Sequence, residues 1–303
     1  MEEIQRFWIE TYNSNLDIQP QQMTSKLLGT VRVEPNINAE THWLDRVGQI
    51  GGQKRNTRFA PAPNNRADTQ RRAIIPGIED TGHVFDRIDE LRQLTDPSNE
   101  IVLAQRAYLG RAIDTTIITA ATGAALFKNV DKTTGSQAFD TSNKRVAVNV
   151  MNKGETPANT GLNIGKLARA QKVLADAEID PESDELVCVL GPQQVADLLE
   201  ETKVGSSDYN NLLPLTTGRL GTFMGMTFVR SGLLPLPAAT HRGVLVYSRR
   251  ALVYGYVGAS PVSAYMTMRS DLAGNPPYAY AKIDGGAVRR HDEGVVQILC
   301  LEP

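Results

Sequence analysis

The stretch that decides the fold is residues 96–127, which read DPSNEIVLAQRAYLGRAIDTTIITAATGAALF. Asp96 can accept hydrogen bonds from the free N–H groups of a first helical turn, and Pro97 follows where its missing N–H does no harm. Apolar side chains then recur at the helical period of about 3.6 residues. They are Val102, Leu109, Ile113, Ile117, Ala120, Ala124 and Phe127, with Tyr108 and Ala112 widening the stripe. We therefore expect one helix over 97–127, roughly 45 Å long, with Arg106, Gly110 and Asp114 on another face.

A basic segment precedes this helix. Residues 46–72 contain glycines, prolines and several cations but a single acid, Asp68. Strand-like pieces at its two ends can pair as a hairpin, but an isolated two-stranded ribbon is marginal in water, so the segment needs a neighbour to lie on. Stacking on nucleic-acid bases requires several aromatic side chains, and this segment has only one, so a contact between subunits is the favoured interpretation. The candidate contact residues are Arg46, Lys54, Arg55, Arg58, Phe59, Arg66, Arg71 and Arg72.

The segments on either side of these two have contrasting character. Residues 1–45 are polar and Pro-flanked and cannot build a core alone, so we expect an arm that lies on another surface, or a loosely docked terminus. Residues 129–161 are polar and suit a surface loop or a small hairpin around DKTTGSQAFD.

An α/β pattern begins at Leu162. GKLARAQKVLADAEI (165–179) has helical periodicity, ELVCVLGP (185–192) predicts a strand, and Pro192 is placed as the first residue of the next helix. Residues 205–214 suit a loop, and residues 249–254 a short helix or turn. Strands expected over 262–268, 278–283 and 295–301 would pair back beside the long helix, which makes the α/β region an insertion.

Composition excludes several classes of protein. The chain has 303 residues, 41% of them hydrophobic and 22% charged, which is typical of a globular protein. A formal charge of −2 argues against a dedicated nucleic-acid binder. No apolar run approaches the roughly 20 residues of a membrane span, and the acidic start MEEIQRFWIE is unlike a signal peptide. We expect a protein made and kept in the cytoplasm of its cell.

Catalytic and metal-binding motifs are not found. The four histidines lack the i, i+4 spacing of a helical metal site, and no Gly-x-Ser-x-Gly elbow occurs. GLNIGK at 161–166 is too short for a phosphate loop and is interpreted as a helix start. Cys188 and Cys300 lie in apolar strand-like runs and are expected to be buried, without a disulfide or a metal. The acids of residues 178–185 are expected to form a solvated rim. We predict no enzyme activity and no cofactor.

Three local motifs and the order of segments carry a family resemblance. The motifs are GRLGTFMGMTFVRSGLLP (218–235), RGVLVYSRRALVYGY (242–256) and DGGAVRRHDEGVVQILC (284–300). With the arm, the basic loop, the long helix and the inserted α/β region, they make the whole chain similar to major capsid proteins of tailed bacteriophages, which have the Hong Kong 97-type fold.

This resemblance implies an α+β fold and a division of the chain. Residues 1–45 would be the N-arm, and 46–90 an extended β-hairpin called the E-loop with its flanking strands. The peripheral domain would take 91–161, with a spine helix at 97–127, and the axial domain 162–260. Residues 261–303 would be strands returning to the peripheral domain. The covalent cross-link of some members cannot be assigned to any residue pair here.

The resemblance also implies partners. Copies of the chain would form pentamers and hexamers of an icosahedral virion shell that packages double-stranded DNA, contacted weakly and without sequence preference. A separate scaffolding protein and a portal are expected, and a cement or decoration protein is compatible with the family; no membrane is involved. Assembly would take place in the host cytoplasm. Two alternatives stay open: an encapsulin-like compartment shell of the same fold, and an α/β enzyme whose site has no recognisable motif.

Overall fold

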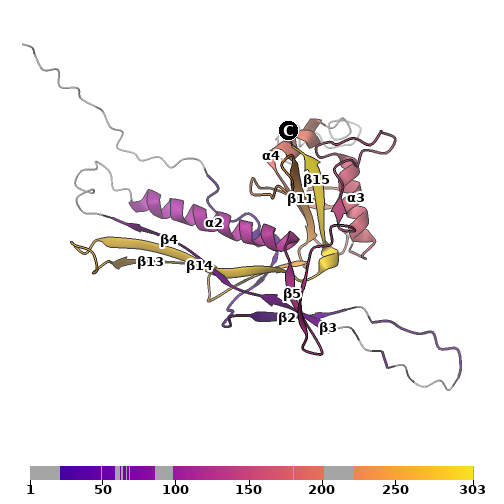
Figure 1. The fold of residues 1–303 in the computed structure, drawn as a ribbon, viewed down its shortest axis with the longest axis horizontal. Coiled ribbons are helices and arrows are strands. Elements are labelled where there is room, and N and C mark those ends of the chain that lie inside the picture. Colours follow the sequence, from indigo (N-terminus) through magenta and orange to yellow (C-terminus); the bar gives the residue numbers. More distant parts are fainter. Residues whose placement is uncertain are drawn as a thin grey trace, which may run out of the picture.

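The structure is a computed structural model and describes residues 21–48, 50–58, 62, 64, 65, 67, 69–85, 98–179, 181–200 and 222–302. In these residues, helix α2 (Ser98–Thr122) lies along three long strands, as Figure 1 shows. They are β4 (Gly77–Val84), β13 (Val262–Met268) and β14 (Pro277–Arg289). β14 pairs with both β4 and β13, and the sheet continues through β12 (Leu252–Tyr256) to β1 (Arg32–Glu34).

A second sheet lies near the C-terminal end of α2 (Figure 1). It is built from β7 (Arg145–Val146), β15 (Val295–Leu301), β11 (His241–Ser248), β8 (Leu186–Leu190), β10 (Met226–Arg230) and β9 (Thr222–Phe223), in that order. Helices α3 (Ile164–Ala175) and α4 (Pro192–Glu200) lie beside it (Figure 1). The first turn of α3 is capped by Asn163, whose side chain accepts from Lys166 N, so the expected helix start at GLNIGK is confirmed.

The third sheet contains the two strands that flank the basic segment. β2 (His42–Val47) pairs with β3 (Thr69–Ile74), β3 with β5 (Ala125–Asn129), and β5 with β6 (Thr134–Gln137). The predicted hairpin of 46–72 is confirmed in its flanking strands, and the small hairpin around DKTTGSQAFD is β5–β6. Two further strands therefore support the ribbon that could not be stable alone.

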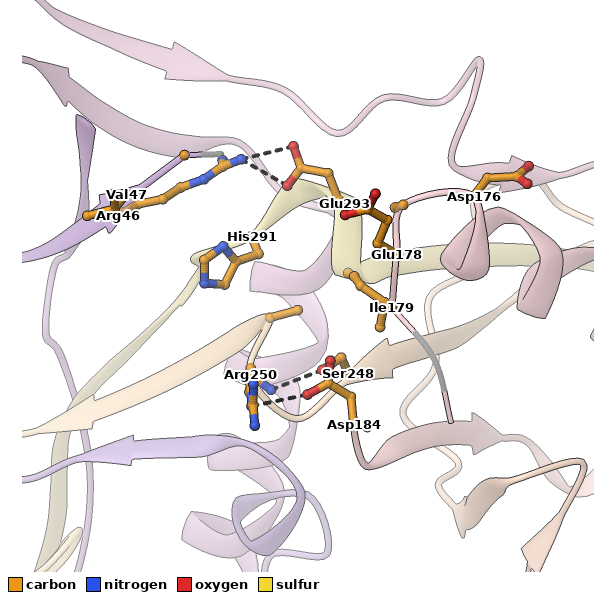
Figure 2. Close-up of a pocket in the computed structure, with 14 residues that line it drawn as sticks. Arg46, Val47, Asp176, Glu178, Ile179, Asp184, Ser248, Arg250, His291 and Glu293 are labelled. Carbon is orange, nitrogen blue, oxygen red and sulfur yellow. Dashed lines mark hydrogen bonds and ion pairs between the residues drawn. The ribbon is translucent and has the colours of Figure 1, made fainter. Parts of the chain in front are cut away.

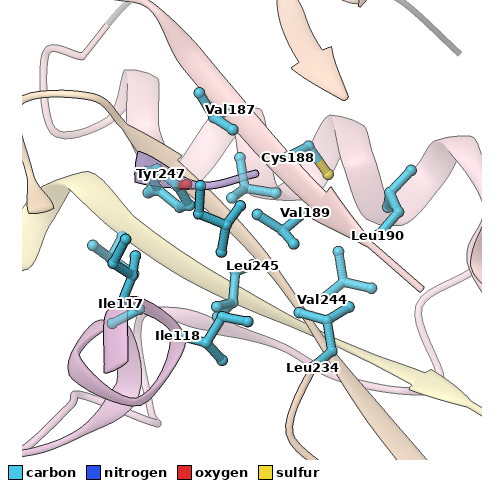
Figure 3. Packing of buried hydrophobic residues seen from close by; sticks show 14 of the residues in the cluster. Ile117, Ile118, Val187, Cys188, Val189, Leu190, Leu234, Val244, Leu245 and Tyr247 are labelled. Carbon is cyan, nitrogen blue, oxygen red and sulfur yellow. The ribbon is translucent and has the colours of Figure 1, made fainter. Parts of the chain in front are cut away.

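One core joins α2 to the second sheet. Figure 3 shows Ile117 and Ile118 of α2 beside Leu245 of β11 and Val189 of β8, and all four side chains are buried in the same cluster. Cys188 and Cys300 are free and buried in it, as expected. Among the described residues, no helix has the length and apolar character of a membrane span.

The expected helix is confirmed over most of its length and wrong at its end. α2 ends at Thr122, and Ala124 and Phe127 lie outside it, with Phe127 in β5 opposite Arg72. The Gly123 N–H donates to Thr119 O in the last helical turn, and the Arg289 guanidinium donates to the carbonyl oxygens of Ala121 and Gly123. These contacts satisfy the end of the helix, so the chain can leave it and join a sheet although the apolar period continues. Asp96 and Pro97 lie outside the described residues.

A second face of α2 is also buried. Gly110 and Asp114, which were expected on another face than the apolar stripe, contact residues 21–31, which we call the strap. The Asp114 carboxylate is fully buried and accepts hydrogen bonds from Gln22 Nε2, Ser25 Oγ, Lys26 N and Leu27 N at 2.5–3.1 Å. A Cβ at Gly110 would lie 2.9 Å from Ser25 N, so only glycine lets the strap approach this closely.

Two expectations for the C-terminal part have different outcomes. The turn allowed for within 249–254 is confirmed at 249–251, and Leu252 to Tyr256 then pair with β14 as strand β12. The strand at 295–301 was expected near the long helix, but it pairs with β11 in the second sheet. β13, by contrast, has the predicted bounds, and β14 does return beside α2 and β4.

We predict that Leu109→Asp prevents soluble folding, because it places an unpaired carboxylate where the native side chain is fully buried. Val102→Asp is the matched control: Val102 is on the same helix but 40% exposed, and its loss should cost no more than about 1 kcal/mol. Soluble yield and thermal melting of the two variants measure this. Two equally soluble variants would show that the buried face is misassigned.

We predict that Asp114→Asn releases the strap. An amide cannot replace a carboxylate that accepts from two backbone and two side-chain groups, and each bond to a charged group contributes roughly 1.5–3 kcal/mol. Hydrogen exchange of residues 21–31 should rise sharply. Asp131→Asn, in an exposed turn, should leave it unchanged, and equal protection in both variants would contradict the assignment.

Candidate functional site

The candidate site is a group of charged side chains at the base of the basic segment. It consists of Arg46, Arg72, Arg289, Asp292 and Glu293, which we call the arginine junction. Arg46 and Arg72 come from β2 and β3, Arg289 ends β14, and the two acids lie in the short 3-10 helix η3 (Asp292–Gly294).

Asp292 is the common acceptor. Its Oδ1 accepts from Arg289 Nε at 2.7 Å, and its Oδ2 accepts from Arg72 Nη2 and lies 3.4 Å from Arg46 Nη1. The Arg46 Nη2 group also pairs with both carboxylate oxygens of Glu293 at 2.9 Å. Charged groups removed from water need partners of this kind, and one carboxylate here supplies them to three arginines.

Arg289 connects the junction to three parts of the fold. Its Nη1 donates to Ala121 O and Gly123 O at the carbonyl end of α2, and its Nη2 donates to Gln137 O in the β5–β6 hairpin. Its guanidinium also lies 5.5 Å from the centre of the Phe139 ring. A cation at the C-terminus of a helix is favoured by the helix dipole, so Arg289 caps α2. The same side chain also connects α2 to the β5–β6 hairpin.

Arg72 is buried within the same junction. Its side chain is 2% exposed, and burial lowers its pKa from the ordinary value, while Asp292 opposes that shift. Burial and the neighbouring Arg46 and Arg290 lower the pKa of His291 as well, so this imidazole is neutral at pH 7.

A cavity of about 710 Å³ lies beside the junction and is shown in Figure 2. Acids of the loop between α3 and β8 line one side of it, opposite Arg46 and His291. Its charges are already paired: Arg46 with Glu293, and Arg250 with Asp184 at 3.1 Å. This loop is the acidic rim expected over 178–185, of which Asp180 lies outside the described residues. Glu185 at its end pairs with Arg249.

The candidate contact residues fall into three groups. Arg46 and Arg72 are bound within the chain, and the Arg72 side chain is buried against Asp292. Arg71 is exposed and pairs with Asp45 across the β2–β3 ladder. Lys54, Arg55 and Arg58 are exposed, and Arg55 donates to the backbone oxygens of Thr57 and Arg58 in its own segment. Phe59 and Arg66 lie outside the described residues.

Sequence reasoning missed Arg289, Asp292 and Glu293. Their signal is the charged run RRHDE at 289–293, enclosed between the apolar strands β14 and β15. A charged cluster flanked by buried strands indicates a partner elsewhere in the chain. The partners in the basic segment are Arg46 of β2 and Arg72 of β3.

The described residues give no support for catalysis or metal binding at this place. They contain no group of three or more His, Cys, Asp or Glu side chains that could hold a metal ion. What the junction can do chemically is hold the two ends of the basic segment against the end of α2.

Comparisons with known proteins give a consistent result. Residues 4–302 match the family model described as phage capsid protein. No curated protein matches the sequence. Among solved structures, a capsid of Cyanophage P-SCSP1u is similar with a TM-score of 0.73 and 13% identity, over 98% of this chain and 94% of that one.

Two further capsids agree with this. The capsid of Ralstonia phage GP4 has a TM-score of 0.71 at 15% identity, covering 97% of this chain and 95% of that one. The capsid of Cyanophage Pam1 has a TM-score of 0.72 at 12% identity, covering 97% and 96%. At such low identity these likenesses establish the mixed α/β fold.

We predict that Asp292→Asn lowers the free energy of unfolding by about 3 kcal/mol, because it leaves three converging guanidinium groups without their shared anion. Glu293→Gln is the control, since the Glu293 side chain is half exposed and pairs with Arg46 at the surface, and it should cost less than about 1 kcal/mol. Urea unfolding of the soluble chain measures both. Equal losses would show that the junction does not depend on Asp292.

Proposed function

The chain belongs to the phage capsid protein family, and from this premise we propose that its copies assemble through pentamers and hexamers into an icosahedral shell that packages double-stranded DNA. Membership itself makes it a structural protein of the virion capsid and, as a major capsid protein, a component of the shell. The pentamers, the hexamers and the DNA are our proposal.

The finer division of the chain belongs to the same proposal. We assign the N-arm to 1–45, the E-loop with its flanking strands to 46–90, the peripheral domain to 91–161 with the strands after residue 261, and the axial domain to 162–260. Two observations qualify these boundaries: β15 lies in the axial sheet, and the core around Ile117 and Leu245 crosses from the spine helix into that sheet.

The observation that carries the proposal is the contrast between the basic segment and its base. Residues 50–58 are exposed along their whole length, whereas the strands that flank the segment are fixed by the arginine junction. An exposed, cationic excursion on a rigid base is suited to contact another copy of the chain. Many modest contacts of this kind let subunits bind, detach and correct errors during assembly.

The partners of this segment are proposed from charge. Acids of a neighbouring subunit would complement Lys54, Arg55 and Arg58 and would give orientation and rate more than affinity. Contact with packaged DNA would be weak, because the whole chain carries a formal charge of −2. A separate scaffolding protein, a portal and a cement or decoration protein complete the proposed set of partners.

Electron microscopy of the purified protein tests the proposal. We expect rings or closed shells, and sedimentation should show large particles at high protein concentration. A chain that stays a monodisperse monomer at all salt and protein concentrations would refute self-assembly. Small empty particles that retain a host enzyme would instead favour the compartment-shell alternative.

We predict that replacing Arg55, Arg58 and Arg66 together by Gln leaves the fold nearly intact and reduces assembly. Exposed charges rarely change stability by more than about 0.5 kcal/mol, but a lost ion pair of about 0.2–1 kcal/mol is repeated at every copy of a shell. High salt should have the same effect on the parent chain, because it shortens the Debye length from roughly 8 Å.

The control removes the same charge elsewhere: Lys153, Arg169 and Lys172 to Gln. Particle yield by sedimentation, with and without DNA, separates the possibilities. A loss of shells in both conditions supports a subunit contact. Normal yields of empty shells with weaker DNA retention would mean that the arginines bind DNA and would end the subunit-contact interpretation.

A further inference from the structure

The long sheet under α2 has an unprotected edge at β13. This strand, VSAYMTM, pairs with β14 on one side, and among the described residues no strand pairs with its other side. It contains no charge, no proline and no glycine. The other long edges are protected by charge, since β4 carries Glu79 and Asp80 and β2 carries Asp45 and Arg46. Edge strands without such protection are ready templates for another strand.

Large apolar side chains are exposed on this edge. Tyr265, Met266 and Met268 are 55%, 60% and 56% exposed. Tyr265 already stacks on Tyr280 of β14, with ring centres 4.9 Å apart, so its position is fixed before any partner arrives. A strand added to β13 would bring its own side chains beside these three, on the two faces of the sheet.

The hydrogen bonds of the sheet fix which backbone groups point outward. Arg269 N donates to Pro276 O, which places Tyr265, with Ser263 and Thr267, among the residues bonded to β14. On the other side of β14, Phe85 N donates to Pro277 O, which gives the same alternation. The N–H and C=O groups directed to the free edge are therefore those of the alternate residues, Val262, Ala264, Met266 and Met268.

We propose that β13 pairs antiparallel with β13 of a second copy of this chain, with Tyr265 on the two-fold axis. In this register Ala264 lies opposite the partner subunit's Met266, and Val262 lies opposite the partner subunit's Met268. All of these residues direct their backbone groups outward, so each pair exchanges two hydrogen bonds. The whole of each strand overlaps, and one sheet runs through both subunits.

Charge selects a second copy over the basic segment as the occupant. β13 is uncharged, so its self-pairing brings no like charges together. The next residue, Arg269, is paired with Asp271. In this register it would lie opposite the partner subunit's Pro261, which carries no charge. The basic segment would instead bring Lys54, Arg55 and Arg58 to a strand that has no acid to receive them. The inference rests on the proposed function only because it requires that copies of the chain associate.

A cysteine on the proposed axis tests the pairing. Tyr265→Cys would face its own copy at a position where Cα atoms are about 4.5 Å apart, within the range of a disulfide. Thr267→Cys is the control, because the same register separates the two copies of residue 267 by about 13 Å along the strands. The natural Cys188 and Cys300 are buried and should not compete.

The shells are assembled under reducing conditions, oxidised and analysed on a non-reducing gel. We expect most of the Tyr265→Cys chain to migrate as a covalent dimer and the Thr267→Cys chain as a monomer. Intact shells with no dimer, or with equal dimer from both variants, overturn the pairing and leave the proposed function standing. If the parent chain forms no shell, the proposed function fails, and the same oxidation of the concentrated soluble chain still decides the pairing.

A backbone variant provides a second measurement. Ala264→Pro removes an outward N–H and keeps the bonds of β13 to β14, so the chain should fold while the shells lose stability. Ser263→Pro removes an N–H used within the chain and should damage folding itself. Shells of Ala264→Pro with the stability of the parent would contradict the proposal.

Discussion

The structure depends on the hydrogen bonds that the last carbonyl groups of one long helix, α2, accept in a place removed from water. The last carbonyl groups of α2 have no helical partners, and Arg289 supplies them while Asp292 balances its charge. The same Asp292 binds Arg72 and Arg46, the two strands of the basic segment. Because a buried guanidinium needs its anion, the orientation of the basic segment is tied to the helix through one carboxylate.

A second buried anion fixes the other side of the helix. Asp114 receives four hydrogen bonds from the strap, and Thr30 in the strap shares a hydrogen bond with the Tyr247 hydroxyl of the second sheet. Burial raises the pKa of Tyr247 beyond its ordinary value, so its hydroxyl keeps its proton at any physiological pH. The strap therefore holds α2 and the second sheet together.

The distribution of exposed and fixed parts explains how such a subunit can build a shell. The basic segment presents cations without a core of its own, and β13 presents an uncharged edge that no described strand pairs with. One surface would act through long-range charge and the other through short-range backbone pairing. Contacts of these two kinds respond differently to salt, since screening weakens the first and leaves the second nearly unchanged.

Periodicity and local chemistry in the sequence determined much of this fold. They located β13 with its bounds, the capped start of α3, Pro192 at the start of α4, the burial of both cysteines and most of the long helix. Tertiary structure alone decided where that helix ends, why Asp114 and Arg72 are buried, and in which sheet β15 lies. The physical reason is that a charged residue is predicted to be exposed unless its partner is known. Here the partners are far apart in the sequence, as Arg72 and Asp292 are. Such pairings follow from the packing of the sheets, which no local pattern encodes.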